Sequence, residues 1–124
     1  MSDVEAAVVE HVRGFPGVLS VYPLFSGLHR QFSEPTRQSY CVIVDPWRDG
    51  RDSREVGLLR FLSGNDLVWQ SSKFRSYVGS HKAYTGLLDN DDRIALSDPN
   101  LLNWLRYMVE RDTGRLVEML EKSL

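Results

Sequence analysis

The apolar positions near the start of the chain recur every three or four residues, which predicts an amphipathic helix. Asp3 can cap this helix, and acidic side chains in its first turn suit the same end. The helix should end before the Gly-Phe-Pro-Gly sequence at residues 14–17, which is typical of a turn. The predicted apolar stripe comprises Val4, Ala7, Val8, His11 and Val12.

A longer helix is predicted at the other end, after the Ser-Asp-Pro-Asn sequence at residues 97–100, where proline suits the first turn. Gly114 lies in its middle at a cost of about 1 kcal/mol relative to alanine, so a kink or break near residues 112–114 is compatible with the pattern. The wide apolar side is expected to pack on a sheet, and a homodimer through this helix is a further expectation. That side comprises Leu101, Leu102, Leu105, Met108, Val109, Leu116, Val117, Leu120 and Leu124, with Trp104 beside them.

Runs rich in β-branched and aromatic residues predict strands at residues 18–25, 39–44 and 67–71. Pro23 lies inside the first run, and because proline cannot donate a hydrogen bond to a neighbouring strand, it predicts an edge position or a bulge. These strands and the terminal helices predict one α+β domain over residues 1–124. In it, a small sheet of about three to five strands is packed by an N-terminal helix and a long C-terminal amphipathic helix.

Residues 53–63 are compatible with two structures. Asp52 and Glu55 have the spacing of a capping box, and the apolar residues that follow share one face of a helix that would end at Gly64. Gly57 weakens the helix prediction, because glycine is a poor helix former. A strand is therefore the alternative for this segment.

The composition is that of an ordinary globular protein, with 42% hydrophobic and 26% charged residues among 124. The formal net charge of −2 differs from the basic charge typical of generic duplex-binding domains. The one cysteine, Cys41, lies in an apolar run and is expected to be buried and unreactive. The chain has no run of the roughly 20 apolar residues that a membrane helix needs, and its acidic start lacks the apolar core of a signal peptide. The cytoplasm is the expected compartment.

Neither a metal nor a cofactor is expected. The histidines, His11, His29 and His81, are far apart in the sequence and have no second ligand at metal-binding spacing, whereas a zinc ion needs several converging ligands. The glycine-rich sequences that bind nucleotide phosphates do not occur in the chain. The serine elbow of α/β-hydrolases does not occur either.

The stretch from Leu24 to Asp45 resembles small nucleotidyltransferases, which carry Gly-Ser after a strand and two metal-binding aspartates before the next apolar run. Here the pair is inverted to Ser26-Gly27, and Tyr40 and Val42 replace the aspartates. Because a carboxylate pair holds the catalytic magnesium ions, the resemblance implies a degenerate domain that lacks transfer activity.

No acidic residue occurs between residues 67 and 88, although the chain as a whole is acidic. Cations beside aromatic rings can attract phosphates or stack on bases and on partner rings. The alternative is that some of these rings belong to the core and that the cations form a solvated face. The basic–aromatic segment has as its candidate residues Trp69, Lys73, Arg75, Tyr77, His81, Lys82 and Tyr84.

A second candidate surface is the charged loop at residues 47–52, in which Trp47 is followed by Arg48 and Arg51. Tryptophan and arginine are over-represented among the hot spots of protein interfaces. The alternative is a surface turn with Trp47 folded back on the sheet.

These patterns favour a non-catalytic protein-interaction module, such as an adaptor, inhibitor or regulatory subunit, that binds another protein through aromatic and arginine surfaces. Nucleic-acid or nucleotide binding through residues 69–84 is the alternative. A small enzyme is the third hypothesis, with His29 and Arg30 in a predicted loop and Asp45 after the second strand as its candidate residues.

Overall fold

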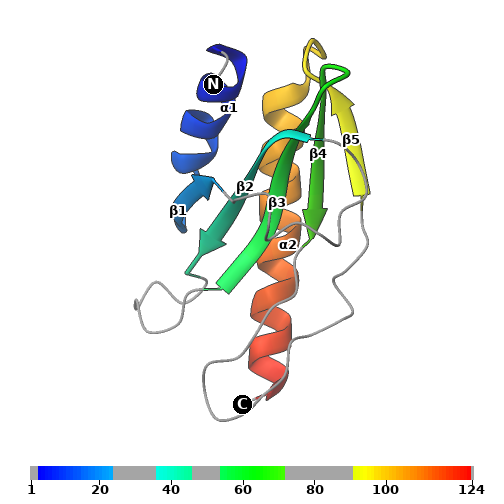
Figure 1. Ribbon diagram of the computed structural model, residues 1–124. Coiled ribbons are helices and arrows are strands. Elements are labelled where there is room, and N and C mark those ends of the chain that lie inside the picture. Colours follow the sequence, from blue (N-terminus) through cyan, green and yellow to red (C-terminus); the bar gives the residue numbers. More distant parts are fainter. Residues whose placement is uncertain (1–2, 24–35, 46–53, 72–90, 124) are drawn as a thin grey trace.

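Within the residues that the structure describes, five strands and two helices form the fold (Figure 1). The computed structural model describes residues 3–23, 36–45, 54–71 and 91–123. The strands form one antiparallel meander in the order β1-β2-β3-β4-β5, so each strand pairs with its neighbours in sequence. The elements are α1 (Asp3–Arg13), β1 (Val18–Pro23), β2 (Thr36–Val44), β3 (Arg54–Leu62), β4 (Asp66–Ser71), β5 (Asp91–Ala95) and α2 (Leu101–Ser123).

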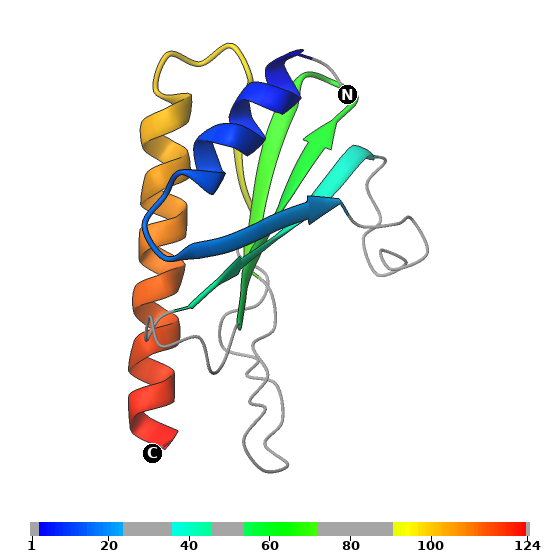
Figure 2. The same ribbon diagram turned by 90° about the vertical axis from the view of Figure 1, so that its left-hand side faces the viewer.

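This arrangement confirms the predicted α+β class. The helix α2 runs along one face of the sheet, and α1 lies across the β1 side of it (Figure 2). Alternate residues of the central strands point at the helices and form one apolar core with them. That core includes Val8, Val9 and Val12 of α1, Val42 and Val44 of β2, Leu59 and Phe61 of β3, Leu67 and Trp69 of β4, and Leu105, Met108 and Val109 of α2.

The helix α1 forms where predicted, and Val8 and Val12 of the predicted stripe are buried, but the buried side is shifted away from the rest of that stripe. Val8, Val9 and Val12 are buried, whereas Val4 is 46% exposed and Ala7 is also exposed. Val9 is buried in place of Ala7, and a valine side chain buries more apolar surface than an alanine. The same side brings Glu5 into the interior, where it is 4% exposed.

Strand β1 is an edge strand, as Pro23 predicted, because among the described strands it pairs only with β2. Its bulge lies between Val18 and Ser20, away from the proline. A guanidinium nitrogen of Arg13 in α1 donates to the carbonyl of Val21 at 3.1 Å. The N-terminal helix therefore satisfies part of the edge-strand backbone, which is one way in which proteins block further strand pairing.

The helix prediction for residues 53–63 is wrong, and the strand alternative is correct. Every residue from Val56 to Leu62 is buried, Arg60 included, so β3 shows no alternation of buried and exposed positions. An amphipathic helix would leave one side of this run in water. Gly64 does not end a helix but lies in the turn that joins β3 to β4, where Asn65 takes the left-handed conformation with φ of 63°.

Strand β5 was not predicted, because its first residues, Asp91 and Asp92, have a low strand propensity. It pairs with β4 from Asp66–Ala95 to Gln70–Asp91. The helix α2 begins at Leu101, after a turn in which the Asn100 amide donates to the Asp98 carboxylate at 2.8 Å. It continues through residues 112–114 without a break. In the part of the chain that the structure describes, no helix is long and apolar enough to cross a membrane.

Candidate functional site

Most candidate residues from the sequence lie outside the described residues. They are Trp47, Arg48 and Arg51 of the charged loop, Lys73, Arg75, Tyr77, His81, Lys82 and Tyr84 of the basic–aromatic segment, and His29 and Arg30. Binding through them stays a prediction. The described part of the chain contains two other features, a buried polar network and a surface groove.

Trp69 is described, and the structure places it in the core. Its side chain is fully buried in β4, opposite Leu59 of β3. A Cβ on Gly57 would lie 2.6 Å from an indole carbon, so the ring fills the space that this glycine leaves open. Trp69 therefore cannot offer its ring to a nucleic acid or a partner from this position. For Trp69, the alternative that some rings of the basic–aromatic segment belong to the core is therefore correct.

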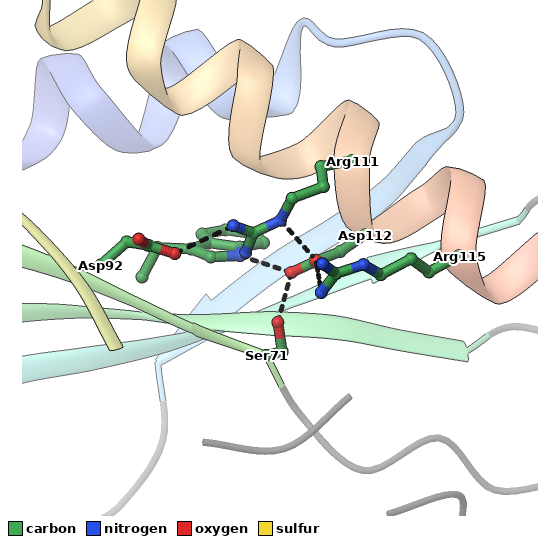
Figure 3. A network of polar contacts seen from close by, with 6 residues as sticks. Ser71, Asp92, Arg111, Asp112 and Arg115 are labelled. Carbon is green, nitrogen blue, oxygen red and sulfur yellow. Dashed lines mark hydrogen bonds and ion pairs between the residues drawn. The ribbon is translucent and has the colours of Figure 1, made fainter. Parts of the chain in front are cut away.

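The carboxylate of Asp112, in α2, is the centre of the polar network (Figure 3). One oxygen, Oδ2, accepts hydrogen bonds from the Trp69 indole at 2.7 Å and from the Ser71 hydroxyl at 2.6 Å. The other, Oδ1, accepts from Nε of Arg111 at 3.0 Å and lies 3.7 Å from a guanidinium nitrogen of Arg115. Asp112 is 0% exposed, so a buried charge has partners at both oxygens.

Arg111 extends this network to the edge of the sheet. Its Nη1 donates to the Asp92 carboxylate of β5 at 3.0 Å. Burial lowers the pKa of Arg111, but the hydrogen bonds to Asp112 and Asp92 outweigh this effect and raise it above its usual value. Arg111 therefore stays charged and ties the helix to β5.

The arrangement of these groups indicates a structural role for the network. Asp112 is closed off from solvent, and each of its oxygens already accepts from a donor, so it cannot reach a substrate. The donors come from β4 and α2, and the second carboxylate comes from β5. The network thus joins the middle of α2 to the end of the sheet at which β4 ends and β5 begins.

The buried position of Asp112 could have been predicted from the spacing of the apolar residues in α2. The buried residues Leu105, Met108 and Leu116 place residue 112 on the same face of α2, four residues from each of the last two. An acid at such a position must find donors in the core, since a buried unpaired charge is costly. Its partner Trp69 is 43 residues away in sequence, which no local pattern reveals.

The surface groove lies between α2 and the turn that joins α1 to β1. Its volume is about 370 Å³, and Phe15 and Pro16 line one side. The guanidinium of Arg106 lies 5.2 Å from the centroid of the Phe15 ring, and the His11 ring meets the same ring edge-on. The α2 side of the groove consists of Arg106, Val109, Glu110, Thr113 and Gly114.

Gly114 lines this groove without being needed by the fold. A Cβ added there would meet no heavy atom within 4 Å, and the residue is exposed in the middle of a continuous helix. Glycine in a helix interior costs about 1 kcal/mol relative to alanine.

We expect Gly114→Ala to raise the free energy of unfolding by about 0.5–1 kcal/mol, measured by urea denaturation. Unchanged or lower stability would contradict this description of the site.

Of the three residues of the enzyme hypothesis, the structure describes Asp45, whereas His29 and Arg30 lie outside the described residues, so the hypothesis stays a prediction. Asp45 is 4% exposed at the end of β2, and its amide donates to the Gly17 carbonyl at 2.9 Å. Tyr40 and Val42, at the positions of the nucleotidyltransferase carboxylates, are core residues. Cys41 is 1% exposed, which confirms the buried position predicted for it. Among the described residues, no group of three or more potential ligands could hold a metal ion.

No protein-family model matches the chain, and no curated protein or solved structure matches it either. The groove is therefore the feature of the described residues from which a function can be inferred.

Proposed function

We propose that this protein is a non-catalytic protein-interaction module that binds a partner protein in the groove between the α1–β1 turn and α2. The groove is the observation that supports this proposal. It combines an apolar floor, formed by Phe15 and Val109, with charged side chains of both signs at its rim. Apolar contact surrounded by polar and charged groups is the usual composition of a protein interface.

The position of the groove supports the same proposal. Its two sides belong to one apolar core, because Phe15 and Val109 are both members of it. Within the same stretch of α2, the Asp112 network ties the helix to β4 and β5. A site on elements held in this way loses little conformational entropy when a partner binds.

We place this activity in the cytoplasm, where a single buried thiol stays reduced. The partner in this proposal is another protein. A homodimer is a second arrangement that the same helix could support, because Leu102 and Tyr107 of α2 are 46% and 60% exposed.

The proposal is tested by partner capture with three forms of the protein. Wild type, Gly114→Leu and Lys122→Leu are immobilised and exposed to lysate of the source cell, and retained proteins are quantified by mass spectrometry. Gly114→Leu fills the groove, whereas Lys122→Leu adds the same side chain to an exposed position of α2 that does not line it.

We expect a partner that wild type and Lys122→Leu retain equally and that Gly114→Leu retains at least tenfold less. Thermal unfolding of all three forms shows that the fold is intact. Equal retention by all three forms would refute a binding role for the groove. A single species twice the mass of the chain, seen by light scattering for wild type and lost in Gly114→Leu, would make the second copy the occupant.

A further inference from the structure

We infer that the occupant of this groove is an extended segment of the partner protein in which an apolar side chain is followed by a lysine or arginine. This inference rests on the proposed function and names the chemistry that the groove would recognise. Its support comes from the length of the groove, the glycine in its wall and the charges at its rim.

The length of the groove fits a short extended segment. Its α2 side runs from Arg106 to Gly114, which at 1.5 Å per residue corresponds to about 12 Å of helix. An extended chain advances about 3.3 Å per residue, so the groove accommodates roughly three or four residues. A volume of about 370 Å³ lies at the small end of the range for ligand sites, which also suits a short segment.

The floor of the groove selects an apolar side chain. Phe15 is 6% and Val109 is 3% exposed, so what remains accessible of them forms the bottom of the groove. Pro16 adds an apolar wall without a backbone donor. A polar side chain placed here would lose water without gaining a hydrogen bond from these three residues, whereas an aliphatic or aromatic side chain would gain apolar contact.

Gly114 allows a backbone to approach the helix. The chain's own packing does not need a glycine there, because nothing lies within 4 Å of the position that a Cβ would take. Glycine is favoured where another backbone must come close, and here it lines the groove at the end of its α2 side. The free space beside Gly114 is therefore explained by a bound segment whose backbone lies directly against α2.

The charges at the rim select a cation beside the apolar side chain. Arg106 lies over the Phe15 ring at 5.2 Å, so its charge already has an aromatic partner. Glu110 is exposed one turn further along α2, and within the described residues it makes no ion pair. A lysine or arginine next to the inserted side chain would pair with Glu110, whereas an acidic residue there would be repelled.

The test uses synthetic peptides titrated into ¹⁵N-labelled full-length protein. The probe is acetyl-Gly-Ser-Leu-Lys-Ser-Gly-amide, and its controls replace the lysine by glutamate or the leucine by glycine. We expect saturable amide shifts from the probe that centre on Arg106, Glu110 and Gly114. Both control peptides should bind at least threefold more weakly, because an exposed ion pair contributes up to about 1 kcal/mol and a leucine contact more.

A charge reversal makes the test specific. Glu110→Lys should reverse the order of the two affinities, so that the glutamate peptide binds more tightly than the lysine peptide. Gly114→Leu should abolish binding of both peptides. Absence of saturable shifts in the wild type, or equal affinity for the lysine and glutamate peptides, would overturn the inferred chemistry. If the peptides give such a result but Gly114→Leu still fails to retain the cellular partner, the groove is a binding site and only the inferred sequence of the bound segment is wrong.

Discussion

Replacing Asp112 by alanine should reduce the free energy of unfolding by about 3–5 kcal/mol. This is the loss expected when one partner of a buried charge network is removed and the others stay in place. The Trp69 indole and the Ser71 hydroxyl would lose the acceptor that they share, and Arg111 would keep a positive charge in a partly buried position. Urea denaturation, followed by circular dichroism, measures the change.

Two further substitutions separate the contribution of the hydrogen bonds to Asp112 from that of its charge. Asp112→Asn keeps an oxygen that can accept from Trp69 and Ser71 but loses the charge that faces Arg111, so an intermediate loss is expected. Arg115→Ala removes a side chain that is 38% exposed and 3.7 Å from the carboxylate, so it should cost less than about 1 kcal/mol. A loss for Asp112→Ala as small as that for Arg115→Ala would show that the network does not stabilise the fold.

Gly57→Ala should be the second most damaging of these changes, with a loss of about 1–3 kcal/mol from overpacking. The added methyl group would lie 2.6 and 2.7 Å from two indole carbons of Trp69 and 3.0 Å from the Gln70 carbonyl oxygen. The indole cannot simply move away, because it is fully buried and its nitrogen donates to Asp112. Denaturation in urea gives the loss directly.

The reason for this loss can be tested separately. Gly64→Ala is the matched control, because a Cβ there meets nothing within 4 Å, and it should change stability by less than about 0.5 kcal/mol. The double variant with Trp69→Phe should cost less than the sum of the single changes, since a smaller ring makes room for the methyl group. Strict additivity, or an equal loss at Gly64, would mean that the contact between Gly57 and Trp69 is not the cause.

The helices were predictable from their period, and three strands were predictable from runs rich in β-branched and aromatic residues. The helix α2 and the strands β1, β2 and β4 formed where their patterns placed them. Strand β3 was ambiguous because residues Val56–Leu62 are buried on both faces, so nothing in their order separates helix from strand. The short strand β5 begins with two acids and becomes a strand through its pairing with β4.

The candidate site was less predictable, because it depends on contacts between distant parts of the chain. Phe15 and Val109, which form the groove floor, are more than 90 positions apart, and neither is unusual in its own segment. Gly114 was noticed only as a weak point of the helix, since the sequence could not show that it faces a groove. For Trp69 the sequence left both a binding surface and the core open, and the structure places it in the core, opposite Leu59.

The claim that the groove binds a partner is tested most directly by site-specific photo-crosslinking in the source cell. Benzoylphenylalanine is placed at Thr113, which lines the groove, and in a second preparation at Lys122, which is exposed on the same helix outside it. The proposal predicts a discrete adduct with another protein from position 113 and little or none from position 122. An adduct of equal yield from both positions, or from position 122 alone, would contradict it.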